Sequence, residues 1–426
     1  MELADDSFRL FLPVLRSFQV KLAPVDRDGC PVSFCTGIVT AAAGKPTPDQ
    51  KSAQIFPAGG QGMSAVSAAA SCLGEIAERL SLCSQGESDD RVFFSRNSQL
   101  EVGLSEVTGL SKAQERCLAG KLGLDYLPGE DPAVNWKALS DRRVMLRSLT
   151  GEGDAQCTSL GVLFGEMELV SDRDISLASS SGCAVWRDMD GARQRALLEL
   201  VERDAVAQGW YNRLGITGVG KAFLAEILPR NLLDFLADRR RVWSLHLVET
   251  DLAAWVVMAL SYESGGRKCA FGSSAGWNFS SACEGALLEL LQAEFSLELM
   301  ERAHAVPAGN RGDRQTLPRQ LVFAREQSIM DHIPLAAASD VDETSFNQTY
   351  SYEALLQSCK DRGLRIWEFN ATRSDLNIPC VKLLSPDLCN WEPRFGKRRL
   401  FDGVVQRGLR SAPAFEAEFA ARPFPF

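Results

Sequence analysis

The segment at 196–203 reads Ala196-Leu197-Leu198-Glu199-Leu200-Val201-Glu202-Arg203, and it is the second of three similar segments in the chain. The first reads Cys72-Leu73-Gly74-Glu75-Ile76-Ala77-Glu78-Arg79, and the third reads Ala286-Leu287-Leu288-Glu289-Leu290-Leu291-Gln292-Ala293. Each has a leucine, a glutamate two residues later, and a glutamate or glutamine three residues after that. The same polar residues at the same spacing indicate three copies of one helix, too short to be solenoid repeats.

Helical geometry separates the polar residues of each copy from its apolar ones. On a helix that turns about 100° per residue, Glu199, Glu202 and Arg203 share one arc, whereas Leu197 and Leu200 lie on the other side. The same holds for the other copies, whose polar faces comprise Ser71, Glu75, Glu78 and Arg79 in the first and Glu289 and Gln292 in the third. One such face is typical of a solvated helix with local ion pairs, but three in register favour a shared site.

Convergence of these faces would bring several carboxylates close together. Like charges at short range are stable only when they are protonated or bridged by cations, and hard oxygen ligands favour magnesium or manganese over zinc. We therefore expect a magnesium site whose ligands are Glu75, Glu78, Glu199, Glu202 and Glu289. Arg79 and Arg203 would then meet an anion brought in by the metal, for which a nucleotide triphosphate is the obvious candidate.

Other chemistries find little support in the sequence. The chain has no Gly-x-x-x-x-Gly-Lys-Ser/Thr loop, and Gly60-Gln61-Gly62 lacks the spacing of a dinucleotide-binding turn. A di-iron bundle needs two Glu-x-x-His motifs, but only Glu301-x-x-His304 is present. With three histidines in all, His-based triads and zinc hydrolase sites are disfavoured, and His246 is expected to be a core or edge residue of a strand.

The composition is that of an ordinary folded protein. Of the 426 residues, 45% are hydrophobic and 24% are charged, and the formal net charge of -9 disfavours nucleic-acid binding. The twelve cysteines include no Cys-x-x-Cys pair, so we expect buried thiols rather than a metal site. The acidic N-terminus and the lack of a long apolar run predict neither a secretory signal nor a membrane span. We therefore expect a cytoplasmic protein without disulfides.

Periodicity and turn residues predict an α+β fold in which helices cover mixed sheets. We expect an N-terminal lobe at 1–56, a central catalytic domain at 57–403 and a proline-containing tail at 404–426. Turns are predicted at Gly59–Gly62 and Ser179–Gly182, and a Gly/Pro/Lys loop near 44–51. Helices are predicted at 65–83, from after 182 to about 212, at 281–303 and at 352–362. Strands are predicted at 18–22, 31–39, 241–249, 253–262, 268–274, 364–370 and 379–385, whereas 84–178 shows little pattern and the stretch up to 350 is linker-like.

The combined motifs resemble those of the YcaO family. Ser71-x-x-x-Glu75-x-x-Glu78-Arg79 is similar to the first ATP-binding signature, and residues 198–205 to the second. The turn at Ser181-Gly182-Cys183-Ala184 and the helix at 286–292 are similar to further family motifs. Asn370 to Pro379, followed by Ser385-Pro386, looks like the final strand pair. The resemblance extends over about 57–403.

This resemblance implies an ATP-binding fold without a P-loop, with three similar glutamate-bearing helices around the ATP and magnesium site. It implies that the glutamates hold Mg2+ and that the nucleotide contacts are made by Ser71, Arg79, Ser181, Arg203, Gln292 and Gln61. Family members activate peptide amides. In the cyclodehydratase branch, a Cys, Ser or Thr side chain attacks the preceding carbonyl, ATP phosphorylates the resulting oxyanion, and loss of phosphate leaves a thiazoline or oxazoline. Phosphorylation makes the poor amide-oxygen leaving group a good one.

The C-terminal residues favour that branch. Cyclodehydratases of the family end in a proline-rich terminus at the active site, and Pro423-Phe424-Pro425-Phe426 is similar but shorter, so Pro425 and Phe426 are expected to act there. The alternative is a frayed tail. The chain departs from the family at Gln61, where relatives commonly have lysine. It also has Glu294-Phe295 where the family often has an arginine nearby, and Arg302 is a candidate for the phosphate contact which that arginine would make.

The resemblance also implies partners: a precursor peptide, a leader-binding protein resembling ubiquitin-activating enzymes, and a flavin-dependent dehydrogenase that would oxidise the rings in bacteriocin or antibiotic biosynthesis. Three alternatives stay open. They are thioamide or amidine formation, an accessory role in modifying a ribosomal protein, and a non-catalytic nucleotide-binding scaffold.

Overall fold

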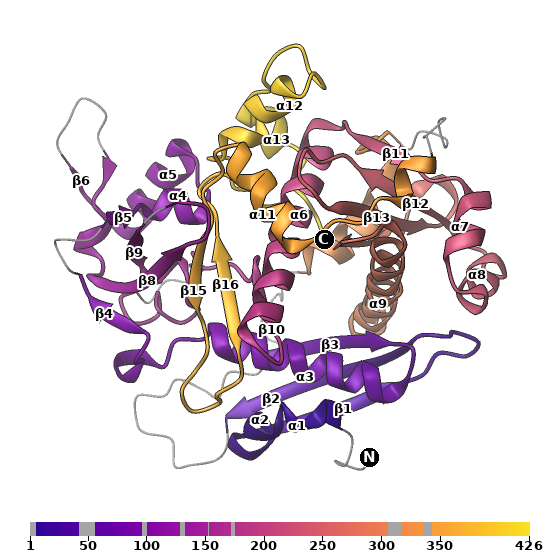
Figure 1. Cartoon of the computed structure of the whole chain (residues 1–426), viewed down its shortest axis with the longest axis horizontal. Helices are drawn as coiled ribbons and strands as arrows, with labels where there is room; N and C mark the ends of the chain where they lie inside the picture. The colour runs from indigo at the N-terminus through magenta and orange to yellow at the C-terminus, as the bar shows by residue number, and fades with distance from the viewer. Residues whose placement is uncertain are drawn as a thin grey trace.

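The computed structural model describes residues 6–41, 56–95, 100–127, 133–151, 153–171, 175–305, 317–334 and 343–426. Three sheets form its framework, and each is covered by a long helix or packed against one (Figure 1). The expected loop near 44–51 lies outside the described residues. The α+β class with mixed sheets is as predicted.

The N-terminal sheet consists of antiparallel strands β1 (Phe18–Val25), β2 (Ser33–Ala41) and β3 (Phe56–Gly62). Strands at 18–22 and 31–39 were predicted, but the turn predicted at Gly59–Gly62 is wrong, because these residues form most of β3. Glycine is needed there for close approach: a Cβ on Gly60 would lie 2.3 Å from the carbonyl oxygen of Ala68 on the covering helix. The sheet also continues across the predicted boundary at 56/57, and the domain division stays a prediction.

Helix α3 (Ala65–Leu82) carries the first copy of the repeated segment and covers this sheet. Ser64 caps its N-terminus in a reciprocal arrangement with Ser67. Leu73 and Ile76 are fully buried, whereas Glu75 and Arg79 are partly exposed. The separation of polar and apolar faces is therefore confirmed for this copy.

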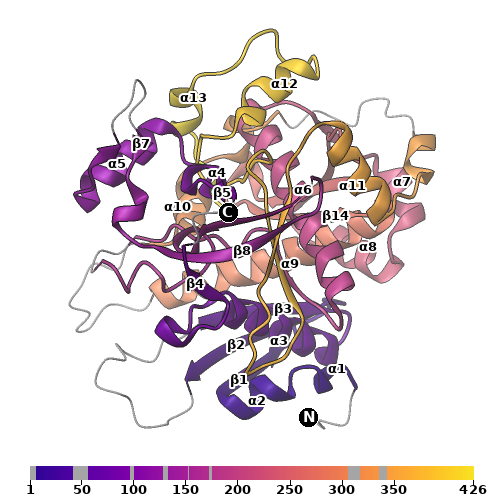
Figure 2. The same ribbon diagram turned by 60° about the vertical axis from the view of Figure 1, so that its left-hand side comes forward.

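A central sheet has the order β10-β16-β15-β8-β9-β5, with β4 (Val92–Phe94) also paired to β8. Its strands are β10 (Cys183–Val185), β16 (Cys380–Leu384), β15 (Trp367–Asn370), β8 (Arg142–Ser148), β9 (Asp154–Thr158) and β5 (Leu100–Val102). The loop between β15 and β16 reaches the N-terminal layer, where Leu376 and Ile378 join its core (Figure 2). Strands β8 and β9 fall in the stretch that showed little pattern, because short, differently buried strands carry no strong periodicity.

Helix α6 (Met189–Asn212) carries the second copy and begins at the Asp188 cap. The helical pattern predicted to start after 182 begins later, because β10 comes first. The turn before it is confirmed at Gly182, whose φ is +76° and whose Cβ would lie 2.5 Å from the carbonyl oxygen of Leu383. Only glycine fits that turn without strain.

The third sheet is the predicted antiparallel meander, with strands β12 (Val242–Val248), β13 (Trp255–Tyr262) and β14 (Ala270–Gly276), preceded by β11 (Ile216–Gly218). Helix α9 (Phe279–Ala305) carries the third copy and packs on it. Gly272 on β14 repeats the role of Gly60, since a Cβ there would lie 2.4 Å from the carbonyl oxygen of Ala286. The same strand-to-helix packing thus positions the first and third copies.

The remaining helices are mostly short. They are α1 (Asp6–Arg9), α2 (Leu12–Ser17), α4 (Leu104–Thr108), α5 (Lys112–Leu122), α7 (Lys221–Ile227), α8 (Arg230–Ala237), α10 (Arg319–Glu326), α11 (Tyr352–Asp361), α12 (Asp402–Gln406) and α13 (Glu416–Ala420). A small hairpin pairs β6 (Tyr126–Leu127) with β7 (Ala133–Val134). In the described part of the chain, every helix is too short or too polar to cross a membrane.

Candidate functional site

One cavity of about 370 Å³ collects residues from all three repeated helices and from the C-terminus. Predicted site residues among its lining are Gln61 from β3, Ser71 and Glu75 from α3, Arg203 from α6, Glu289 and Gln292 from α9, and Phe426. These helices start at Ala65, Met189 and Phe279, so only the tertiary structure brings residues of all three to one cavity. The cavity is the candidate active site.

Glu202 and Glu289 meet at one residue of strand β14. The hydroxyl of Ser273 donates to Glu202 Oε1 at 2.6 Å, and its backbone N–H donates to Glu289 Oε2 at 3.2 Å. The N–H of Ala275 donates to the other oxygen of Glu202 at 3.2 Å. The strand therefore fixes the direction in which both carboxylates point. Sequence reasoning missed Ser273, because its role depends on pairing between a strand and two distant helices.

Arg203 is held between a carboxylate and an aromatic ring. Its Nη2 lies 3.2 Å from Glu199 Oε1, and its guanidinium carbon lies 3.3 Å from the centre of the Trp391 ring. Its Nε and Nη1 are buried and have no hydrogen-bond partner, although Nη1 is 3.4 Å from Glu202 Oε1. Arg203 lines the cavity, and a guanidinium with two donors that lack a hydrogen-bond partner fits an anionic ligand such as a phosphate.

The carboxylates of the site repel one another in a buried setting. Burial, together with the charge of Glu202, raises the pKa of Glu289 to about 8. Burial also raises the pKa of Glu78 and of Glu199. A bound cation would remove this penalty, so the donor set fits Mg2+ in kind and in charge. Among the described residues, no three acidic, histidine or cysteine side chains already surround one point at ligand distance.

Other predicted residues lie outside this cavity. Arg79 pairs with Glu75 at 2.6 Å and donates to the carbonyl oxygen of Pro57 at 2.5 Å. Ser181 lines a separate cavity of about 40 Å³ and donates to Asn390 Oδ1 at 3.2 Å. Glu78, Glu199 and Glu202 are likewise not among the lining residues of the main cavity.

Lys382 is a charged residue that sequence reasoning missed. It is 1% exposed on β16, and its Nζ donates to the carbonyl oxygens of Ser179 and Ser181. Burial lowers the pKa of Lys382, and the negative charges of Glu199 and Glu78 oppose this shift. The sequence did contain a signal, since this lysine interrupts the apolar run Val381 to Leu384. A lysine in a buried strand indicates polar partners nearby, because an unpaired lysine is rarely fully buried.

The C-terminal tail is docked, so the frayed alternative is wrong. The ring of Phe424 stacks on Trp391 with centres 4.8 Å apart, and Phe426 stacks on Phe271 at 5.1 Å. The backbone N–H of Phe424 donates to the Tyr211 hydroxyl at 3.2 Å. Both views place the C-terminus inside the molecule (Figures 1 and 2). Phe426 reaches the main cavity, and Pro425 lines the cavity next to it.

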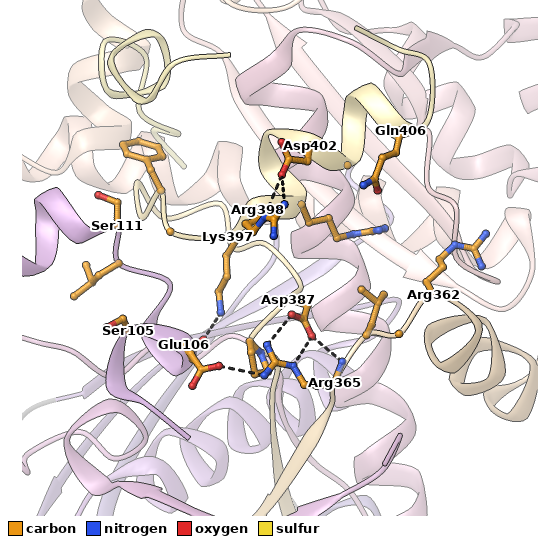
Figure 3. Close-up of a pocket in the computed structure, with 18 of the residues that line it drawn as sticks. Ser105, Glu106, Ser111, Arg362, Arg365, Asp387, Lys397, Arg398, Asp402 and Gln406 are labelled. Atoms are coloured by element: carbon orange, nitrogen blue, oxygen red, sulfur yellow. Dashed lines mark hydrogen bonds and ion pairs between the residues drawn. The ribbon is translucent and has the colours of Figure 1, made fainter. Parts of the chain in front are cut away.

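A larger cavity of about 970 Å³ lies elsewhere, between α4, the start of β15 and α12 (Figure 3). Several of its charged residues are already paired: Arg365 with Glu106 at 3.1 Å and with Asp387 at 3.0 Å, and Arg398 with Asp402 at 3.1 Å. It contains none of the predicted site residues. Size alone would therefore select the wrong candidate.

Comparison with known proteins identifies the family and the fold. Residues 59–389 match the family model described as YcaO cyclodehydratase, ATP- and Mg2+-binding. Similar solved structures include a heterocyclase in complex with substrate and cofactor (TM-score 0.73, 19% identity, 98% of this chain and 57% of that chain). They also include YcaO from Methanopyrus kandleri bound with AMPPCP and Mg2+ (0.55, 17%, 96% and 92%) and the E. coli microcin synthetase McbBCD complex (0.54, 16%, 86% and 87%).

The chain spans 57% of the length of that heterocyclase and 51% of the length of a second similar structure, the heterocyclase TruD (TM-score 0.65, 20% identity, 85% of this chain). At such identities the likeness establishes a shared fold. No curated protein sequence gives a significant match.

Proposed function

The chain belongs to the YcaO family, and on that premise we propose that it uses ATP and Mg2+ to convert Cys, Ser or Thr residues of a ribosomally made peptide into thiazolines or oxazolines. The observation that carries this proposal is the single cavity that gathers the three repeated helices and the docked C-terminus. A nucleotide site and a peptide-modifying site would thereby share one space.

In this proposal the five glutamates of the repeated helices hold Mg2+, which would neutralise charge on the phosphates. Glu202 and Glu289 are oriented for this by Ser273. The unsatisfied donors of Arg203 bind a phosphate oxygen, and Gln61, Ser71 and Gln292 contact the nucleotide. Gln292 Oε1 is buried without a hydrogen-bond partner, which supports a role in contacting a ligand.

The proposed reaction occurs on the peptide. The thiol or hydroxyl of the reacting residue attacks the preceding carbonyl carbon, and the resulting oxyanion takes the terminal phosphoryl group of ATP, releasing ADP. Departure of phosphate with loss of a proton from the amide nitrogen then leaves the azoline C=N bond. Phe426 and Pro425 would help to exclude water from this step, since they lie at and beside the cavity.

Arg79 and Ser181 do not line the main cavity, so neither can contact the nucleotide directly in the arrangement described above. Arg79 would have to leave Glu75 to reach a phosphate. Ser181 would act through the turn that Lys382 holds. Partner proteins are also proposed: a leader-binding protein and a flavin-dependent dehydrogenase, as the resemblance to the family implies. That one similar structure is a synthetase complex supports the presence of partners in general.

A non-catalytic nucleotide-binding scaffold is the second candidate, and one observation favours it. Gln61 lines the cavity, so no lysine stands there to neutralise phosphate. Incubation of the chain and its partner with MgATP and a Cys-containing precursor, followed by mass spectrometry and phosphate assay, separates the candidates. Loss of one water per ring with matching phosphate release supports cyclodehydration. ATP binding without turnover supports the scaffold, and a mass change due to sulfur incorporation supports thioamide formation.

A further inference from the structure

The candidate active site continues into two neighbouring cavities. The next cavity, about 290 Å³, shares Gln320, Trp391 and Phe426 with it. A third, about 540 Å³, shares Arg319, Glu392 and Pro393 with the second. Each cavity shares lining residues with the next, so the three adjoin one another between the site and α5. The two outer cavities are here called the tail-side groove.

The walls of this groove are fixed by contacts across the fold. Trp391 stacks on Phe424 and its carbonyl oxygen accepts a 2.7 Å hydrogen bond from the Tyr211 hydroxyl. The carbonyl oxygen of Pro393 accepts a 2.7 Å hydrogen bond from Gln114 Nε2. A groove with preordered aromatic and proline walls loses little entropy when an extended chain enters it.

The outer part of the groove carries an excess of positive charge. Arg319 and Lys121 line it, and neither has an ion-pair partner among the described residues. The acidic residue there, Glu392, is already engaged by Arg394 at 2.8 Å and by the Ser179 hydroxyl at 2.8 Å. Two cations that have no ion-pair partner in the described part of the chain, beside an acidic residue that is already paired, favour acidic side chains in whatever occupies the groove.

We propose that the tail-side groove holds an extended segment of the peptide substrate next to its reacting residue, and that Arg319 and Lys121 select acidic side chains in that segment. This inference rests on the proposed function, because it assigns a peptide-binding role to the groove beside the proposed reaction site. The acidic side chains and the ring-forming residue would then be different positions of one extended segment, because successive residues of an extended peptide are about 3.3 Å apart.

The test uses two fluorescein-labelled peptides that each contain one Cys flanked by Gly and Ser, with three Glu residues in one and three Lys residues in the other. Binding is measured by fluorescence anisotropy with the full chain, Mg2+ and AMPPCP at low ionic strength. The double variant Arg319→Glu/Lys121→Glu should bind the acidic peptide about tenfold more weakly than the original chain does, and should bind the basic peptide more tightly. Lys360→Glu, an exposed change on α11 outside the groove, is the matched control and should change neither.

Three outcomes would each overturn the groove assignment. They are equal binding of both peptides to the original chain, an unchanged preference in the double variant, and no saturable binding into the millimolar range. AMPPCP affinity, measured by calorimetry on the same proteins, keeps the two proposals apart. If nucleotide binding and phosphate release persist while the peptide preference fails, the groove is wrong and the proposed function stands. If Mg2+-dependent nucleotide binding fails in the original chain, the proposed function fails.

Discussion

The hydroxyl of Ser273 donates a 2.6 Å hydrogen bond to Glu202, across 71 residues of sequence. The same residue contacts Glu289 through its backbone, so one position of β14 orders carboxylates from two of the three repeated helices. Strand β14 is therefore part of the proposed metal site without supplying a ligand.

Replacement of Ser273 by alanine removes the hydroxyl but keeps the backbone contact to Glu289. A hydrogen bond to a charged group contributes about 1.5–3 kcal/mol, so we expect the Mg2+ concentration for half-maximal ATP turnover to rise about tenfold or more. A Mg2+ titration of phosphate release measures this. Ser274→Ala is the control, since that side chain faces Gly285 on α9; an equal effect of both changes would contradict the role of Ser273.

Glu199→Gln and Glu202→Gln should each abolish Mg2+-dependent turnover, because glutamine keeps the shape of the side chain but lacks the charge that a cation needs. The fold should persist, since glutamine keeps an oxygen that can accept from Arg203 at position 199 and from Ser273 at position 202. Circular dichroism checks folding and phosphate release checks turnover. Normal turnover in either variant would refute the assigned role.

Trp391 is expected to position Arg203 for the nucleotide. Trp391→Leu removes the ring that lies 3.3 Å from the guanidinium carbon, and a desolvated contact of this kind contributes about 2 kcal/mol. The KM for ATP should therefore rise on the order of tenfold, measured by steady-state kinetics. Trp391→Phe keeps an aromatic face and should recover most of the affinity; a KM equal to that of the leucine variant would argue against ring stacking.

Deletion of residues 423–426 should reduce ring formation more than ATP affinity. The deletion opens the cavity at Phe426 and leaves Trp391 without its Phe424 neighbour, but it removes none of the glutamates. Mass spectrometry of the peptide and calorimetric titration with AMPPCP measure the two quantities. Phe415→Ala, at a ring that is 76% exposed, is the control within the same tail. An unaffected yield of rings would contradict a role for the tail in the reaction.

Stability should fall in mild acid because of His246. It is 3% exposed, and burial lowers its pKa from 6.5 to about 4. Between pH 4 and pH 6.5, His246 therefore binds a proton in the unfolded chain but not in the folded chain. The stability present above pH 6.5 is lost as the pH falls toward 4. The loss amounts to about 3 kcal/mol. Urea unfolding at several pH values should show a smaller pH dependence for His246→Gln, and an unchanged slope would contradict this assignment.

Several parts of the fold were predictable because their signals are local. The three helices and the meander follow from hydrophobic periodicity, and their observed bounds differ from the predicted ones by a few residues, except at the start of α6. Gly59–Gly62 was misinterpreted because glycines that usually mark a turn here allow a strand to touch a helix.

The sequence by itself determined that three helices carry glutamates on one face, since residues three and four apart on a helix are neighbours whatever surrounds them. Only the tertiary structure decided which of those residues share a cavity, and that Lys382, Ser273 and Trp391 join the site. The physical reason is that these contacts link strands, helices and the tail across about 70 to 200 residues, and no local pattern encodes such distances.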